Sequence, residues 1–238
     1  MRLILSVKDL SKSFGALRVT DHVSFDVREG EIVGIIGPNG AGKTTLFGLL
    51  SGIIRPDHGA IDFRGLDVTT LPTHERVRAG LARTYQVPKP FTHMTVADNV
   101  KVAAQFGGHM GEEEASFWVD RVLAMTGLQR VRSMLAGRLP LLMRKRLELA
   151  RALGSRPRLL LVDEVAAGLT DREVDDFIEL IGQIRDLGMT VVWIEHVMKT
   201  MLTATDRLLA LAQGALIAAG TPDEVINSRE VRRVYLGA

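Results

Sequence analysis

The 238-residue sequence contains no cysteine, which excludes disulfide bonds and thiolate metal sites. No apolar run approaches the roughly 18 residues that a membrane-crossing helix needs. The stretch from Met1 to Asp9 is only briefly apolar and is interrupted by charge, which argues against a secretion signal. The net charge is only +2, so composition gives no case for a nucleic-acid or anionic-membrane surface. We expect a globular protein that binds no nucleic acid and does not insert into a membrane.

Residues 37–45 carry the most specific motif, because they fit the phosphate-binding pattern G-x-x-x-x-G-K-[ST]. An apolar strand is expected before the loop and an apolar helix after it, which argues against the alternative of a mere glycine-rich turn. Backbone N–H groups and the helix N-terminus would hold the phosphates of a nucleoside triphosphate. Lys43 would reach the β and γ phosphates, and the Thr44 hydroxyl would bind Mg²⁺. The predicted nucleotide-binding residues are Gly37, Pro38, Asn39, Gly40, Ala41, Gly42, Lys43, Thr44 and Thr45.

The order of apolar patterns predicts an α/β fold. The first thirty residues alternate between apolar and polar, which indicates antiparallel strands with one buried face, and residues 60–65 indicate a short hairpin strand. Continuous apolar runs then predict a parallel sheet covered on both faces by helices. These runs lie at 31–36, 159–162, 191–194 and 208–211, with a helix expected over 172–187.

Helical spacing from Val96 to Leu153, with apolar positions that include Val100, Phe117 and Val122, predicts a helical block inside this α/β pattern. We expect a single domain over residues 1–238. Its nucleotide-binding core and β subdomain would comprise residues 1–86 and 154–238, with an inserted helical subdomain at 87–153.

An acidic pair follows one of the apolar runs. Asp163 and Glu164 come at the end of the predicted strand 159–162, and ligands bind at the C-terminal ends of parallel strands. Asp163 would hold Mg²⁺, directly or through water, and Glu164 would act as general base toward the water that attacks the γ phosphate. Alone, such a pair is more often a solvated strand end. The phosphate loop makes the catalytic interpretation the better one.

Three single residues are weaker candidates. Gln86 lies where the β-rich part gives way to the helical block, and its amide could bind Mg²⁺ or its water, although an isolated Gln is usually a surface residue. His196 follows the predicted strand 191–194, where an isolated histidine is more often structural. Phe14 could stack on a purine ring or pack in the core.

Taken together, these elements resemble the ATP-binding subunits of ABC transporters over nearly the whole chain. The resemblance preserves order and spacing, from Phe14 at the adenine-stacking position through 37–45 (Walker A), Gln86 (Q-loop), 139–153 (signature region), 159–164 (Walker B and glutamate) to His196 (switch histidine). In finer detail the chain is similar to the subunits of branched-chain amino-acid importers. The segments that carry this likeness are 51–59, 83–86, 166–169, 195–199 and 220–225.

The resemblance implies a P-loop NTPase core, with a mostly parallel sheet and flanking helices, plus an N-terminal antiparallel β subdomain and an inserted α-helical subdomain. It implies ATP hydrolysis with Mg²⁺, in which His196 contacts the γ phosphate and Gln86 couples the site to the helical subdomain. Two ATP-binding subunits would face each other head to tail, and the helical subdomain would grip a membrane permease. The chain would then sit on the cytoplasmic face of the inner membrane.

The signature segment departs from the family pattern L-S-G-G-Q, because only its leucine survives in Leu139-Pro140-Leu141-Leu142-Met143. Pro140 supplies neither a hydroxyl nor an amide donor, and Leu142 is bulky where a phosphate must approach. We expect poor hydrolysis of ATP bound by the partner's Walker motifs, which favours a heterodimer with a subunit that carries an intact signature. The alternative is that the loop tolerates this variation. Val165 and Thr170 also depart from the family, which usually has proline and then aspartate or asparagine there.

Two other functions remain open at the level of sequence. A soluble, non-transport ABC-type ATPase usually carries two cassettes or long coiled-coil insertions, and this chain shows neither. A regulatory subunit with little turnover would fit the degraded signature, but the residues expected to hydrolyse ATP on this side are all present.

Overall fold

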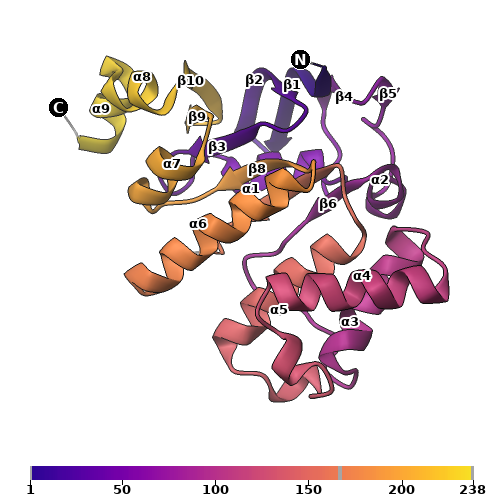
Figure 1. The fold of residues 1–238 in the computed structure, drawn as a ribbon. Coiled ribbons are helices and arrows are strands. Elements are labelled where there is room, and N and C mark those ends of the chain that lie inside the picture. The colour runs from indigo at the N-terminus through magenta and orange to yellow at the C-terminus, as the bar shows by residue number, and fades with distance from the viewer. Residues whose placement is uncertain (1, 166–167, 237–238) are drawn as a thin grey trace. The chain divides into compact units, whose positions relative to one another are not determined.

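The computed structural model describes residues 2–165 and 168–236, which belong to two compact units (Figure 1). The first unit combines residues 1–73 with residues 166–238, and the second unit comprises residues 74–165. Within the segment 166–169, residues Ala166 and Ala167 lie outside the described residues. The expected subdomain boundaries at 86/87 and 153/154 stay predictions.

An antiparallel sheet in the first unit is built from the alternating part of the sequence. Its strand order is β2-β1-β4-β5, with β1 at Leu3–Phe14, β2 at Leu17–Arg28, β4 at His58–Phe63 and β5 at Leu66–Asp67. In β2, Val23, Phe25 and Val27 are buried, and the residues between them are exposed. Because successive side chains of a strand point to opposite faces, this alternation gives the sheet one buried face. The predicted antiparallel β subdomain is confirmed.

The first unit also holds parallel strands made from continuous apolar runs. β3 (Ile32–Ile36) pairs in parallel with both β8 (Thr190–Ile194) and β9 (Arg207–Ala212). β10 (Ala215–Gly220) pairs with β9 in the antiparallel direction. Every residue of β3 and β8 is buried. Strands covered on both faces need no polar alternation, which is why these strands are apolar apart from Thr190 and Arg207 at the starts of β8 and β9.

The first unit also contains five helices among its described residues. They are α1 (Lys43–Leu50), α6 (Asp171–Asp186), α7 (Met198–Ala204), α8 (Pro222–Asn227) and α9 (Arg229–Leu236). Thr170 begins α6 with a capping box, in which its hydroxyl accepts from the Glu173 backbone N–H. The side chain of Phe177 on α6 meets Trp193 of β8 edge to face, with 5.4 Å between ring centroids. The threonine at position 170 therefore has a structural role of its own.

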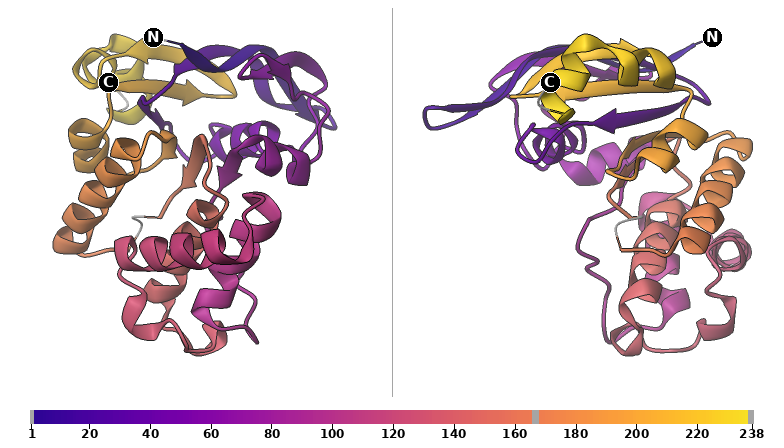
Figure 2. Two further views of the ribbon diagram at one scale, coloured as in Figure 1. Left: turned by 45° about the vertical axis from the view of Figure 1, so that its right-hand side comes forward. Right: turned by 90° about the vertical axis from the view of Figure 1, so that its left-hand side faces the viewer.

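The second unit combines two parallel strands with the helical block. β6 (Leu81–Arg83) pairs with β7 (Leu159–Asp163), and α2 (Thr73–Ala79) precedes them. The block contains α3 (Val96–Val102), a π-helical turn (Ala103–Gly107), α4 (Glu112–Met125), 3₁₀ turns at Gln129–Val131 and Ala136–Arg138, and α5 (Leu141–Gly154). α3, α4 and α5 pack against one another (Figure 2). The predicted helical character of this block is confirmed.

Phe117, one of the apolar positions of the predicted helical pattern, is 71% exposed. Neighbouring residues of an α-helix point about 100° apart. α4 turns Trp118, Val119 and Val122 inward, which directs Phe117 to the surface.

Among the described residues, no helix has both the length and the apolar character needed to cross a bilayer.

Candidate nucleotide-binding site

The glycine-rich loop joins β3 to α1 in the first unit, so the predicted strand, loop and helix are in place. Gly42 begins α1 with a φ of +98°, a conformation that other residues rarely adopt. A Cβ on Gly42 would lie 2.4 Å from the Val19 carbonyl oxygen, and one on Gly37 would lie 2.5 Å from the Leu211 carbonyl oxygen. The loop is thus packed closely against its own unit at both ends, which requires glycine at these two positions.

Lys43 places its charge over this loop. The side chain is buried, and Nζ donates to the carbonyl oxygens of Gly37 at 2.7 Å and Pro38 at 3.0 Å. Thr44, in the first turn of α1, is exposed. A cation and a hydroxyl therefore lie at the N-terminus of one helix, where its dipole also favours anions.

The acidic pair lies in the second unit, at the end of β7. Asp163 is buried, its carboxylate accepts a hydrogen bond from Arg83 Nη2 at 2.8 Å, and its backbone N–H donates to the Thr84 hydroxyl at 2.9 Å. Glu164 follows with a φ of +46°, and its carboxylate accepts from Gln86 Nε2 at 2.5 Å. The structure thus brings Gln86 and Glu164 together, and their roles as Q-loop and catalytic base stay predictions. The contact of Arg83 with Asp163 was not predicted.

His196 and Phe14 belong to the first unit. His196 is exposed just after β8, and its backbone N–H donates to the carboxylate of the buried Glu195 at 3.2 Å. Phe14 ends β1 and is 51% exposed, with Lys12 Nζ 5.6 Å from its ring centroid. Core packing of Phe14 is therefore wrong. Its contact with adenine stays a prediction, as does the role of His196.

The degraded signature segment leads directly into α5. Pro140 precedes the first residue of the helix, and no side chain caps this end. Leu141 is 67% exposed. The Arg144 guanidinium instead donates back to the carbonyl oxygens of Leu139 and Gly137, both at 2.8 Å. The surface at this helix end therefore presents apolar side chains, with no hydroxyl at position 140.

Two charged residues of α5 were missed by the sequence analysis. Glu148 is buried and forms an ion pair with Arg151 at 3.0 Å, while Arg151 donates to the Lys89 carbonyl oxygen at 2.7 Å. The Lys89 backbone N–H also donates to Glu148 at 3.4 Å. The signature helix is thus tied to the segment that follows Gln86. The spacing of Glu148 and Arg151, three residues apart on a helix, could have predicted their ion pair. This spacing does not predict that Glu148 is buried.

Burial raises the pKa of Glu148 above its ordinary value of 4.5, against the opposing effect of Arg151. The folded chain therefore keeps this proton over a pH range in which the unfolded chain has released it, and stability falls as pH rises through that range. We expect Glu148→Gln to remove this part of the pH dependence. Urea unfolding between about pH 4 and pH 7 measures it, with the exposed Glu179→Gln as control. If the free energy of unfolding of wild type and of Glu148→Gln changed in parallel with pH, the raised pKa of Glu148 would be contradicted.

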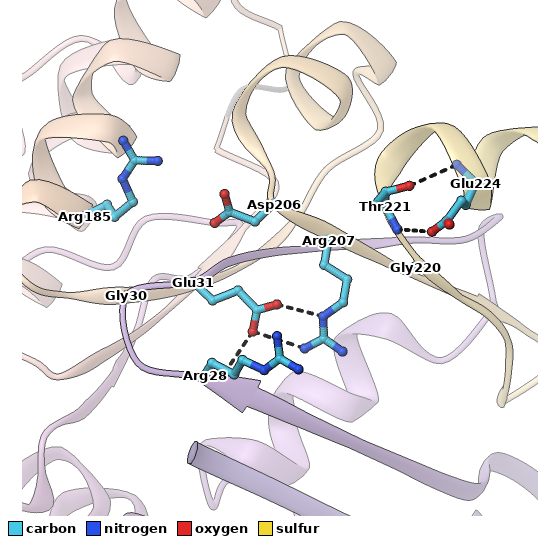
Figure 3. A pocket seen from close by; sticks show the side chains of 9 residues that line it. All are labelled: Arg28, Gly30, Glu31, Arg185, Asp206, Arg207, Gly220, Thr221 and Glu224. Atoms are coloured by element: carbon cyan, nitrogen blue, oxygen red, sulfur yellow. Dashed lines mark hydrogen bonds and ion pairs between the residues drawn. The ribbon is translucent and has the colours of Figure 1, made fainter. Parts of the chain in front are cut away.

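A pocket of about 520 Å³ in the first unit is lined by charges of both signs (Figure 3). The Glu31 carboxylate accepts from Arg207 Nε at 2.7 Å and from the Arg28 backbone N–H at 2.9 Å. Asp206 accepts from the Ile32 backbone N–H at 2.8 Å. These contacts fix the starts of β3 and β9, and β3 leads into the phosphate loop. They give Glu31, Asp206 and Arg207 structural roles in this pocket.

A phosphate-binding loop between a buried parallel strand and a helix, with an acidic pair ending another buried strand, defines a P-loop nucleotide-binding protein. The family described as ABC transporter matches residues 20–167, and the chain belongs to this family. It is an ABC transporter ATPase and binds ATP. Residues 215–238 match a second family, described as branched-chain amino acid ATP-binding cassette transporter.

Known relatives cover almost the entire chain. The high-affinity branched-chain amino acid transport ATP-binding protein BraF of Pseudomonas aeruginosa is 37% identical, over 99% of this chain and 98% of the relative. The lipopolysaccharide export system ATP-binding protein LptB of Escherichia coli is 36% identical, over 98% and 97%. Among solved structures, an ATP-binding cassette of an ABC transporter in its ADP conformation has a TM-score of 0.89 at 29% identity, over 100% of both chains. The predicted fold class is confirmed.

Proposed function

We propose that the chain is the ATP-hydrolysing subunit of an importer for branched-chain amino acids or a related small solute. The match of residues 215–238 to the branched-chain family carries this proposal. Overall identity does not, because the branched-chain relative at 37% and the lipopolysaccharide export relative at 36% are nearly equal. Export of a lipid-like substrate is for that reason the second candidate.

In the proposed reaction, the loop at 37–45 and Lys43 bind the phosphates of ATP. Glu164 takes the proton of the attacking water, His196 contacts the γ phosphate, and Gln86 links the site to the helical subdomain. The observed hydrogen bond between Gln86 and Glu164 supports this link, because movement of the Q-loop would directly move the base. Phe14, at the exposed end of β1, stacks on adenine.

Mg²⁺ fits the chemistry of these side chains. In phosphoryl-transfer sites it is held by one or two protein oxygens together with phosphate oxygens, not by a cage of protein ligands. The Thr44 hydroxyl and the Asp163 carboxylate offer hard oxygen donors, with Gln86 as a further one. Among the described residues, no group of three or more His, Cys, Asp or Glu side chains could hold a metal. When bound, Mg²⁺ would neutralise charge on the β and γ phosphates.

The partner is a second ATP-binding subunit, and we favour a heterodimer. ABC subunits work as pairs in which each signature helix completes the other's site. Here exposed Pro140 supplies neither a hydroxyl nor a backbone N–H just before α5, and exposed Leu141 adds no polar side chain for a γ phosphate. An intact signature must then come from the partner. The helical subdomain would bind the permease, so the chain would lie on the cytoplasmic face of the inner membrane.

The test is reconstitution of the chain with the ATP-binding subunit and permeases encoded beside it. We expect ATP-dependent uptake of labelled leucine into proteoliposomes, and no uptake with Lys43→Ala. Turnover stimulated by lipopolysaccharide, without leucine uptake, would favour the exporter. Turnover that needs no permease would favour the soluble ATPase.

A further inference from the structure

Arg83 and Asp163 form a buried ion pair within the second unit. Arg83 Nη2 donates to Asp163 Oδ2 at 2.8 Å, and the two side chains are 9% and 2% exposed. Burying a carboxylate is costly unless cations or hydrogen-bond donors compensate for its lost hydration. Arg83 supplies such a cation from the strand beside the one that carries Asp163.

The register of the two strands sets this pair. β6 runs parallel to β7 with Arg83 opposite Leu161, and side chains two residues apart on a strand share a face. Asp163 therefore follows Leu161 on the face where Arg83 lies. The Thr84 backbone N–H donates to the Leu161 carbonyl oxygen at 2.9 Å, which continues the pairing beyond β6.

Two further contacts hold the ends of this arrangement. The Asp163 backbone N–H donates to the Thr84 hydroxyl at 2.9 Å, which fixes the main chain under the carboxylate. The Arg83 guanidinium lies over the Tyr85 ring, 5.5 Å from its centroid. Each partner of the ion pair thus has a further contact besides the ion pair itself: Asp163 with Thr84, and Arg83 with Tyr85. Such a guanidinium orients a carboxylate as well as balancing its charge.

We propose that Arg83 is a positioning residue for Asp163, an inference that rests on the proposed role of Asp163 as a Mg²⁺ ligand. Arg83 holds the Oδ2 atom of the Asp163 carboxylate in one place. Carboxylates that bind metals are commonly held by hydrogen-bonding partners, and the loss of such a partner lowers metal affinity about 10–100-fold. Arg83 therefore tunes how strongly Mg²⁺ supports ATP binding.

The experiment uses the full chain with Glu164→Gln, which prevents turnover during the measurement. A fluorescent ATP analogue reports binding while Mg²⁺ is titrated. We expect Arg83→Met to raise the half-maximal Mg²⁺ concentration by about 10-fold or more and to leave binding in EDTA unchanged. Arg83→Lys, which keeps the charge but loses the fork geometry, should recover part of this loss.

Arg207→Met is the matched control, because Arg207 also pairs with a carboxylate, that of Glu31, at 2.7 Å (Figure 3). It should leave the Mg²⁺ dependence unchanged. Asp163→Asn separates the hypothesis that Asp163 binds Mg²⁺ from the hypothesis that Arg83 positions Asp163. If Asp163→Asn does not alter the Mg²⁺ dependence, the proposed role of Asp163 is wrong. If Asp163→Asn alters it and Arg83→Met does not, the positioning role of Arg83 alone is overturned.

The double variant Arg83→Met with Asp163→Asn guards against misfolding, because it leaves no uncompensated buried charge. If Arg83 acts through Asp163, adding Arg83→Met to Asp163→Asn should change the Mg²⁺ dependence no further. Additive effects of the two substitutions would show that Arg83 acts elsewhere and would overturn the proposal.

Discussion

Glu164→Gln is expected to lower ATP turnover of the assembled transporter by about 100-fold or more, which is the range that a general base contributes. The substitution keeps the size and shape of the side chain. An amide oxygen at position 164 can still accept the hydrogen bond that Gln86 Nε2 donates to Glu164. The decrease in the turnover rate therefore reports the contribution of the carboxylate as a base. The rate of phosphate release measures ATP turnover in both proteins.

ATP binding should survive in this variant, because the phosphate loop and Lys43 are untouched. We expect retained nucleotide together with lost turnover. Glu179→Gln on α6 is the control, since it removes an exposed carboxylate of the same kind, and it should leave turnover unchanged. Turnover that persists in Glu164→Gln would contradict the assignment of Glu164 as the base.

The parallel strands could be predicted from sequence because burial on both faces leaves no room for polar residues. β3 and β8 are buried throughout, and each is a continuous apolar run in the sequence. The phosphate loop could be predicted because its glycines serve a local backbone conformation, seen in the φ of +98° at Gly42. Local patterns of this kind do not depend on which distant segment lies beside them.

The contacts of Arg83 and Glu148 could not be predicted in this way. Arg83 meets Asp163 only because β6 and β7 align in one register, and the two residues are 80 positions apart in sequence. Glu148 reads as a solvated residue of a polar helix, yet α5 buries it against the segment near Lys89. Phe117 shows the reverse case, since this aromatic residue belongs to an apolar pattern yet lies exposed on α4. Tertiary packing decides each case.

Restoring the signature should strengthen ATP-driven self-association of the chain. Pro140→Ser would supply a hydroxyl and a backbone N–H just before α5, and Leu142→Gly would remove the side chain that blocks a phosphate. Each new hydrogen bond to a charged phosphate contributes about 1.5–3 kcal/mol. One such bond at each of two sites would strengthen a homodimer by well over tenfold. Sedimentation velocity with ATP, in a Glu164→Gln background, measures the change.

A second double variant distinguishes the effect of the added hydroxyl from the effect of removing bulky side chains. Pro140→Ala with Leu142→Ala also trims this helix end and restores one backbone N–H, but it adds no hydroxyl. We expect it to give a smaller gain. No gain in either double variant would mean that the natural segment already serves a partner's ATP. The argument for a heterodimer would then fail, because its premise is that Pro140 and Leu142 leave the opposite site incomplete.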